Sequence, residues 1–447
     1  MKKMEVDVLV AGAGTAGIIA GLAAARNGAK TLMIDKQRCV GGQFTAGMQG
    51  AWVGFSDKKK QIVKGMTWEL RDRLMARNAI VEDDPDTDVC FLYDTEAAKV
   101  VLDEWIAEEP NLEAFVDTSI VDVIMDGDDV KGLVVLSETE LMEIYAKVVI
   151  DGSGDAAVAF KAGAPFEIRN KEDIQPMTLM GKVAGVDIER VKAYYAEHPP
   201  VKDHMVPPAW RDFKTFPGFM HFGLADELEG KDLPADKEYL REWLGIFTST
   251  PNPGEVTINC SGALGSHSVA GFRERTEQEV FSQKCLADVA WAFKNFVPGF
   301  ENSYLSAISS LLGIRESRRI IGDYKVTLDD FLEARDFEDS IGRGAMPAGA
   351  HTPDGVTMYV YDLEPGKSMT IPYRCMLPKG KNNMLVVGRC VSYEAPVANC
   401  IRCMPQCMVM GEAAGTAAAL AIKAGVSVRD VDIKQLQAKL IEQGGIL

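Results

Sequence analysis

Positive charge is scarce in this sequence of 447 residues. Its 48 Lys and Arg are outnumbered by 65 Asp and Glu, so the formal net charge at pH 7 is −17. Such a chain is a poor partner for nucleic acid, because binding a run of phosphates requires clustered Lys and Arg. A small acidic ligand is still compatible with this charge, since a local pocket can oppose the field of the whole protein. We therefore expect no nucleic-acid partner.

Histidine and cysteine are also sparse. The five histidines are His198, His204, His221, His267 and His351, and no pair of them has metal-ligand spacing on one face. The nine cysteines are an odd number and are unevenly spaced, which does not indicate a disulfide framework. We expect no metal site and a reducing, cytoplasmic location.

Long apolar runs are nearly absent. The run from Val6 to Ala25 follows Lys2 and Lys3, and on hydropathy alone it resembles a signal peptide or a membrane anchor. Because its glycines would make a poor apolar helix, we interpret it as a buried strand, a glycine turn and a helix. No other run approaches membrane-spanning length, so we expect no membrane span. The chain length predicts two domains or three.

The N-terminal segment predicts a βαβ unit that binds a dinucleotide. Val6–Val10 has the pattern of a buried strand, Ala16–Arg26 that of a helix and Thr31–Ile34 that of a second strand. The GxGxxG motif from Gly12 to Gly17 lies between the first strand and the helix. Asp35 follows the second strand, where a carboxylate can accept ribose hydroxyls.

Each glycine of the motif has its own role. Gly12 permits the tight turn, Gly14 lets the backbone approach a pyrophosphate, and Gly17 lets the helix lie close to the sheet. The helix N-terminus then offers free N–H groups and partial positive charge to the phosphates. The spacing alone does not decide between FAD and NAD.

Further motifs resemble those of the glutathione-reductase superfamily of FAD proteins. Gly41-Gly42 is similar to the second glycine pair of that superfamily, and Ser153-Gly154-Asp155 to its second FAD contact. Gly388-Arg389 and the segment Gly411–Gly415 are similar to its third. The resemblance implies that the helix predicted for Pro405–Ala421 points its N-terminus at the flavin.

Segments along almost the whole chain resemble the bacterial family of FAD-dependent oxidoreductases. They are Val40–Gly47, Tyr93–Lys99, Ile150–Asp155, Gly313–Arg319, Ile371–Arg374 and Gly388–Ser392. The resemblance implies an enzyme that transfers a hydride between flavin N5 and a small polar metabolite. It also implies that FAD is bound by Gly12, Gly14, Thr15, Ala16, Gly17, Asp35, Lys36, Gly41, Gly42, Gln43, Thr45, Ile120, Ser153, Gly154, Asp155, Gly388, Arg389 and Met404.

The fold that this resemblance implies is α/β, with an FAD-binding Rossmann domain of the glutathione-reductase type. That domain has a parallel sheet with a β-meander, and we expect it at residues 1–165 and 370–447. An inserted mixed α+β substrate or cap domain is expected at residues 166–369. Within the first domain the patterns predict a helix at Thr95–Glu108, a hairpin of Val121–Met125 and Gly132–Leu136, and strands at Ala146–Ile150 and Met384–Val387.

A second GxGxxG motif is missing, as is a close cysteine pair after Gly42. We therefore expect neither a separate NAD(P)H domain nor a disulfide reductase of the glutathione-reductase kind. Cys400, Cys403 and Cys407, with Cys390 nearby, are either packing residues beside the flavin or iron–sulfur ligands. Iron–sulfur ligation would favour the alternative function, a flavin-containing electron-transfer subunit. The electron acceptor or donor, and whether the chain forms homo-oligomers, stay open.

Arginines from separate segments favour a local anion site. Arg402 precedes the last long helix and Arg315 begins a cluster of three arginines, and guanidinium groups grip carboxylates in a bidentate way. The alternative is that most of these arginines pair with carboxylates between domains. His351 and Tyr373 lie where the chain returns to the first domain. We expect a polar or carboxylate-bearing substrate held by Arg402 and Arg315, with His351 or Tyr373 moving the proton.

Overall fold

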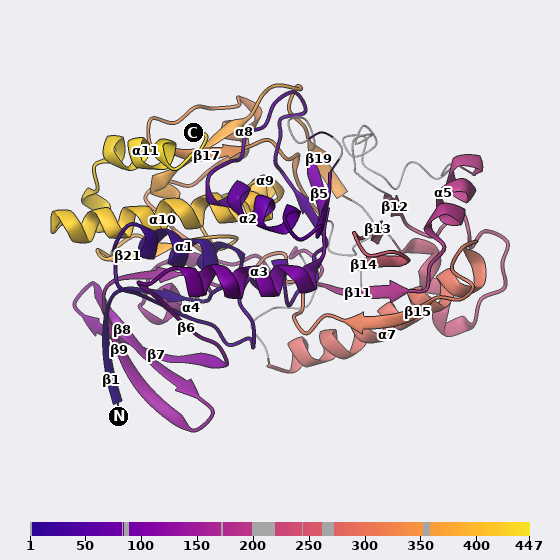
Figure 1. Cartoon of the computed structure of the whole chain (residues 1–447), viewed down its shortest axis with the longest axis horizontal. Coiled ribbons are helices and arrows are strands. Elements are labelled where there is room, and N and C mark those ends of the chain that lie inside the picture. Colours follow the sequence, from indigo (N-terminus) through magenta and orange to yellow (C-terminus); the bar gives the residue numbers. More distant parts are fainter. Residues whose placement is uncertain are drawn as a thin grey trace.

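The two largest β-sheets lie toward opposite ends of the molecule (Figure 1). The computed structural model describes residues 2–82, 84, 89–170, 173–198, 220–243, 245–261, 272–351 and 358–447. Of the histidines considered above, His204 and His267 lie outside these residues.

The larger sheet has seven strands in the order β6-β2-β1-β9-β8-β7, with β21 also paired to β9. Strands β6, β2, β1, β9 and β21 pair in parallel, whereas β7, β8 and β9 form an antiparallel meander. This sheet confirms the expected α/β fold with a parallel Rossmann-like core. Its strands are β1 Lys2–Ala11, β2 Thr31–Ile34, β6 Leu112–Phe115, β7 Thr118–Asp126, β8 Asp129–Ser137, β9 Glu140–Asp151 and β21 Met384–Val386.

Helices α1 (Thr15–Arg26) and α10 (Met404–Ala424) pack against each other through small residues. A Cβ at Gly411 would lie 2.1 Å from the carbonyl oxygen of Ala16, a distance that no side chain could tolerate. The two helix backbones can approach this closely because glycine occupies the contact. The C-terminal segment is therefore joined to the first βαβ unit in one apolar core.

Helix α10 is long and apolar enough to cross a membrane by length and composition. The expectation that no run after the first one approaches such a length was therefore wrong. Within the protein, 78% of its apolar stretch is buried. Its apolar surface is thus used for packing in the core, as in a helix that is hydrophobic all round and buried.

The second sheet has five antiparallel strands in the order β12-β13-β14-β11-β15. Val183, Phe247 and Ile258 on one of its faces pack with Leu286 and Phe293 of helix α7 in a separate apolar cluster. The elements are β11 Thr178–Ala184, β12 Met220–Phe222, β13 Ile246–Ser249, β14 Glu255–Ser261, β15 Tyr304–Ile308, α5 Ile188–Glu197 and α7 Phe272–Phe296.

Residues 166–369, expected as an inserted domain, contribute to both cores. Phe331 and Ile341 pack in the main cluster with Ala413, whereas Val183 and Phe247 belong to the cluster of the second sheet.

The remaining elements are α2 Met66–Met75, α3 Thr95–Glu108, α4 Ala157–Lys161, α8 Leu328–Leu332, α9 Ala398–Arg402, α11 Ile433–Glu442, β3 Ala51–Val53, β4 Ile80–Val81, β5 Cys90–Tyr93, β10 Phe166–Glu167, β16 Arg319–Ile320, β17 Ser340–Gly344, β18 Ala348–His351, β19 Met358–Tyr361 and β20 Met369–Pro372.

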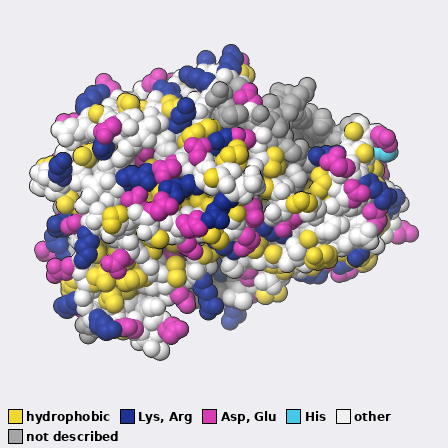
Figure 2. Space-filling model, viewed as in Figure 1, with side chains coloured by type: hydrophobic (Ala, Val, Ile, Leu, Met, Phe, Trp, Pro, Cys, Tyr) yellow, Lys and Arg dark blue, Asp and Glu magenta, His cyan; other side chains and the backbone are white. Residues whose placement is uncertain are grey.

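Charged side chains of both signs are interspersed over the face shown in Figure 2. No large patch of Lys and Arg is visible on the described part of that face. This distribution fits the net charge of −17.

Candidate active site

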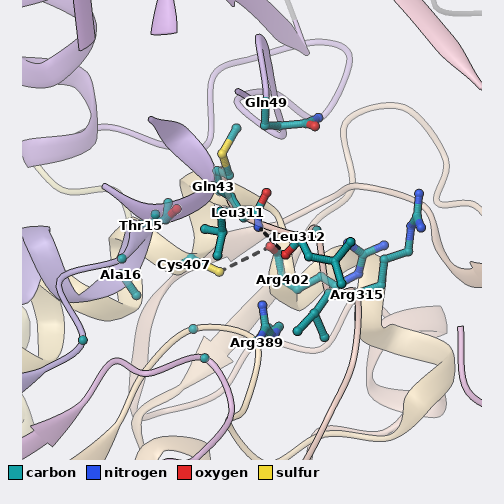
Figure 3. A pocket seen from close by; sticks show the side chains of 18 of the residues that line it. Thr15, Ala16, Gln43, Gln49, Leu311, Leu312, Arg315, Arg389, Arg402 and Cys407 are labelled. Atoms are coloured by element: carbon teal, nitrogen blue, oxygen red, sulfur yellow. Dashed lines mark hydrogen bonds between the residues drawn. The ribbon is translucent and has the colours of Figure 1, made fainter. Parts of the chain in front are cut away.

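A cavity of about 750 Å³ lies between the carboxyl ends of the parallel strands and the second sheet. Ligands of open α/β sheets bind at this edge. We call one side the cofactor wall, which is formed by residues 12, 14–16, 35–37, 152–155 and 387–389. The opposite side is the roof, formed by Thr178, Met180, Ile246, Thr248, Thr257 and Asn259. In Figure 3, Thr15 and Ala16 from the start of the chain share the cavity with Arg402 and Cys407 from its end.

The three glycines of the first motif differ in what surrounds them. Gly12 has a φ of +99°, and a Cβ there would lie 2.7 Å from the backbone of Ser153. A Cβ at Gly17 would lie 1.9 Å from the carbonyl oxygen of Gly12, so Gly17 serves helix packing and does not line the cavity. At Gly14 the nearest atom to an added Cβ would be 3.8 Å away, the carbonyl oxygen of Gly152. The backbone at Gly14 is therefore open to a ligand.

Lys36 and Ile120 line the cavity. Asp35, which directly follows β2, lines it too. Its Oδ1 accepts a hydrogen bond from the backbone N–H of Gln37 at 2.8 Å. Burial raises the pKa of this carboxyl, although the Gln37 hydrogen bond opposes the shift. A buried carboxylate with further acceptor capacity fits the hydroxyls of a ribose.

Two arginines from distant segments contact the loop of Ser153, Gly154 and Asp155. Arg389 pairs with Asp155 at 2.6 Å, and Arg275 of α7 pairs with the same carboxylate at 3.4 Å. Burial alone would raise the pKa of Asp155, but the two guanidinium charges and a hydrogen bond with Ser317 hold it well below its usual range. Arg275 and Arg389 thus place two guanidinium groups beside this loop. The sequence motifs did not indicate Arg275.

The loop after Asp35 has a ligand side and a supporting side. Gly42 and Gln43 line the cavity, whereas Gly41 and Thr45 do not. The hydroxyl of Thr15 donates to the carbonyl oxygen of Gly41 at 3.1 Å, which ties the loop to the start of α1. Gly41 and Thr45 therefore shape the loop from behind instead of facing a ligand.

The N-terminus of α10 also reaches the cavity. Met404, Cys403, Cys407 and Gly388 line it. Burial raises the thiol pKa of Cys403 to about 11 and that of Cys407 to about 12. Among the described residues, no group of three or more His, Cys, Asp or Glu could hold a metal ion. The arrangement favours packing cysteines over iron–sulfur ligands.

Arg315, Arg402 and His351 come together from three segments (Figure 3 labels both arginines). Burial and the charge of Arg402 lower the pKa of Arg315 to about 9. Burial, with the charges of both arginines, lowers the pKa of His351 well below its usual value. The imidazole is therefore neutral at pH 7. Nη1 of Arg315 donates to the carbonyl oxygen of Pro176 at 2.5 Å, and Nη2 of Arg402 donates to Oδ1 of Asn399 at 2.5 Å.

This cluster has unused hydrogen-bonding capacity. Nε of Arg402 and Nδ1 of His351 are buried and have no partner within the described ranges. Leaving a buried guanidinium donor without a partner costs free energy, which a bound carboxylate would recover.

Tyr373, the other candidate for proton transfer, is not brought to the cavity. Its hydroxyl is buried and donates to the carbonyl oxygen of Val428 at 2.9 Å, and burial raises its pKa. Tyr373 directly follows β20 and packs in the main core. Its position in the sequence did not indicate this burial. The neighbouring Arg374 forms an ion pair with Asp339 at 3.0 Å. This arginine therefore pairs with a carboxylate of the protein, as the alternative interpretation expected.

The sequence motifs also missed the roof. Part of the signal was present, because Thr257 and Asn259 alternate with Val256 and Ile258 as expected of a strand with one polar face. The alternation along β14 does not indicate that this strand pairs with β11, which is far from it in sequence.

The cofactor wall fits FAD. It combines an open glycine backbone at a helix N-terminus, a buried carboxylate at Asp35 and the guanidinium groups of Arg275 and Arg389. All of the expected cofactor residues line the cavity except Gly17, Gly41 and Thr45. Their individual contacts with FAD stay predictions.

Comparisons with known proteins found a relative of part of this chain. The sequence is 28% identical to thiamine thiazole synthase of Pyrococcus furiosus over 166 residues, which are 35% of this chain and 60% of that protein. The match therefore spans less than two thirds of this relative's length.

Solved structures similar over most of the chain include two oxidoreductases by name. One is a geranylgeranyl bacteriochlorophyll reductase-like protein from Thermoplasma acidophilum (15% identity, TM-score 0.47, 99% of this chain and 85% of that one). The other is p-nitrophenol 4-monooxygenase from Pseudomonas putida (12% identity, TM-score 0.46, 96% of this chain and 82% of that one).

A family match covers nearly the whole sequence. Residues 7–440 match the family described as FAD dependent oxidoreductase. That range includes the cofactor wall, the roof and the arginine cluster. The chain therefore belongs to the FAD dependent oxidoreductase family, as an enzyme whose cofactor is FAD.

Proposed function

We propose that this enzyme transfers a hydride between the flavin and a small metabolite that carries a carboxylate. The proposal rests on one observation, the position of the buried Arg315 beside the half-buried Arg402 at the cavity. Two like charges repel each other in a poorly solvated site, so an anion between them removes a cost that the protein otherwise bears. A carboxylate suits the planar guanidinium group through paired hydrogen bonds.

The chain's own residues then divide the work. FAD, when bound, accepts or supplies a hydride at N5. Arg402 and Arg315 hold the substrate carboxylate and orient the reacting carbon. In the oxidative direction a substrate hydroxyl gives its proton to the neutral imidazole of His351, while the hydride leaves from the same carbon. The carboxylate also offsets the two guanidinium charges, which raises the proton affinity of His351 once substrate is bound.

A titration of the holoenzyme with carboxylates tests this proposal. The flavin absorption spectrum reports binding, and anaerobic bleaching reports reduction. We expect acids to bind and their amides to bind at least tenfold more weakly, because the amide lacks the charge that pairs with the arginines. Amides and acids that bind equally well would contradict the proposal.

Variants separate the two roles. Arg402→Ala should raise the Kd of a carboxylate by about ten- to a hundredfold, with partial recovery in Arg402→Lys. Arg374→Ala is the matched control, because that arginine pairs with Asp339 and does not line the cavity. His351→Gln should leave Kd nearly unchanged, slow bleaching and remove its dependence on pH. An electron-transfer subunit would instead show no bleaching with any metabolite.

A further inference from the structure

The roof turns a mixed face toward the cavity, with the polar side chains of Thr178, Thr248, Thr257 and Asn259 beside Met180 and Ile246, whereas its other face is apolar. Side chains along a strand alternate between the two faces of a sheet. On β14, Val256 and Ile258 belong to the apolar cluster that includes α7, whereas Thr257 and Asn259 line the cavity. Thr248 of β13 lines it too. Packing of the sheet against α7 uses the other face and does not require polar side chains on this one.

Two of these hydroxyls are neighbours. Thr248 and Thr257 are direct cross-strand partners, and they are 4% and 3% exposed. Oγ1 of Thr257 is buried and finds no hydrogen-bond partner among the residues that the structure describes. One row further along the same face, the hydroxyl of Thr178 donates to Oδ1 of Asn259 at 2.6 Å. This contact fixes the orientation of the amide at the cavity.

The polar roof side chains that line the cavity are neutral. Lys182 is the partner of Thr257 on β11, but its ammonium group lies 3.5 Å from Asp94 and 3.4 Å from Glu255. Its charge is therefore engaged within the protein. Threonine hydroxyls and an asparagine amide both donate and accept, as do the hydroxyls of a ligand.

We propose that the roof is a hydroxyl-binding subsite, and that the substrate is a hydroxylated carboxylate. The inference rests on the proposed function: the acid group lies at Arg315 and Arg402, and the hydroxyls along the carbon chain meet Thr248, Thr257 and Asn259. The buried hydroxyl of Thr257 costs free energy while it has no partner, and a hydroxylated ligand satisfies it in a way that an alkyl chain cannot.

Matched pairs of acids test the subsite on the FAD-loaded enzyme. The pairs are glycerate against propionate, and gluconate against hexanoate, with Kd measured by calorimetry and by the flavin spectrum. We expect the hydroxylated member of at least one pair to bind about tenfold more tightly. Hydroxylated members that bind no tighter than their alkyl counterparts in both pairs overturn the inference while the carboxylate proposal stands. A failure of acids to bind better than amides overturns the proposed function, and the inference with it.

Isosteric variants locate the effect. Thr257→Val and Thr248→Val should each weaken binding of the preferred hydroxylated acid about three- to tenfold, leave its alkyl counterpart unchanged and keep the FAD content. Thr67→Val is the matched control, because Thr67 is fully buried with an unpartnered hydroxyl but lies on α2, outside the cavity. Loss of FAD in the roof variants, with unchanged relative affinity for the two acids of a pair, would assign these hydroxyls to the cofactor and overturn the inference.

Discussion

The cofactor wall and the roof face the same cavity but are built differently. The wall presents mainly backbone, from Gly12, Gly14 and Gly154, and its few side chains are held by one another. The roof presents side chains from alternate positions of antiparallel strands. A backbone surface can be altered only by moving the chain, whereas each roof side chain can be exchanged alone. The wall therefore suits a fixed cofactor, and the roof suits the recognition of a particular substrate.

The largest effect is expected within the wall, where Gly14 and Gly17 should fail in different ways. Gly14→Val leaves the protein folded, because an added Cβ meets no protein atom within 3.8 Å, but it blocks the approach of the pyrophosphate. Gly17→Val also disrupts the fold, since its Cβ would lie 1.9 Å from the carbonyl oxygen of Gly12. Bound FAD after gel filtration and the thermal unfolding midpoint distinguish the two. Full FAD occupancy in Gly14→Val would show that the wall is not the cofactor side.

The next largest effect concerns Glu412, a buried carboxyl in the helix that supports the wall. Burial raises its pKa to about 7, while the backbone N–H of Met66 donates to it at 3.0 Å and Arg26 opposes the shift. The folded protein thus holds a proton that the unfolded chain releases near pH 4.5. Stability from this group is complete below about pH 4.5 and declines as pH rises through 7, by about 3 kcal/mol.

Glu412→Gln should remove this decline, so that the variant becomes relatively more stable toward pH 8. The measurement is the difference in free energy of unfolding between variant and parent from pH 5 to 8. Glu104→Gln is the control, because Glu104 is an exposed carboxyl. A difference that does not change with pH would show that Glu412 is ionised throughout.

A smaller effect is expected at Arg275, where the two sides meet. This arginine comes from the helix behind the roof but pairs with Asp155 of the wall. Arg275→Gln should weaken FAD binding about three- to tenfold and leave riboflavin binding unchanged, because only FAD carries the pyrophosphate. Arg273→Gln, an exposed neighbour outside the cavity, is the control. Equal losses for FAD and riboflavin would mean that Arg275 serves only to hold the loop.

The smallest effect is expected from nicotinamide cofactors. The sequence has one GxGxxG motif, so NADH and NADPH should reduce the flavin slowly or not at all. Stopped-flow absorbance under anaerobic conditions measures this rate. Fast reduction by either would show that the roof admits a dinucleotide, and the contrast between the two sides would be lost.

The cofactor wall could be predicted because its geometry depends on local backbone rules. Helix α3 and strand β2 were predicted with both ends correct and α1 to within one residue, since their apolar periodicity and boundary residues are local signals. The expectation that Arg315 and Arg402 share a site came from the presence of arginines in separate segments and the affinity of guanidinium groups for carboxylates, and the structure places both at the cavity. Their function in binding stays a prediction.

The other features depend on contacts that local patterns do not contain. Tyr373 was expected at the site. Its side chain instead packs in the main core, and this direction depends on tertiary contacts. The roof requires β11 to pair with β14 across a long stretch of chain, whereas β13 and β14 are consecutive antiparallel strands. The membrane-like length of α10 is explained only by the helix against which it packs. Each of these depends on tertiary structure.

The contact between α1 and α10 also has a consequence in time. Asn27, which follows α1, donates to the hydroxyl of Thr416 across 389 positions of sequence, at 3.4 Å. At synthesis rates of about 5–20 residues per second, the first helix waits about 20 to 80 seconds for its partner to leave the ribosome. During that interval its apolar surface is uncovered and available to chaperones. The turn between β1 and α1 is thus made early and is completed only when α10 packs against α1, so newly made protein should acquire its yellow colour only after α10 has left the ribosome.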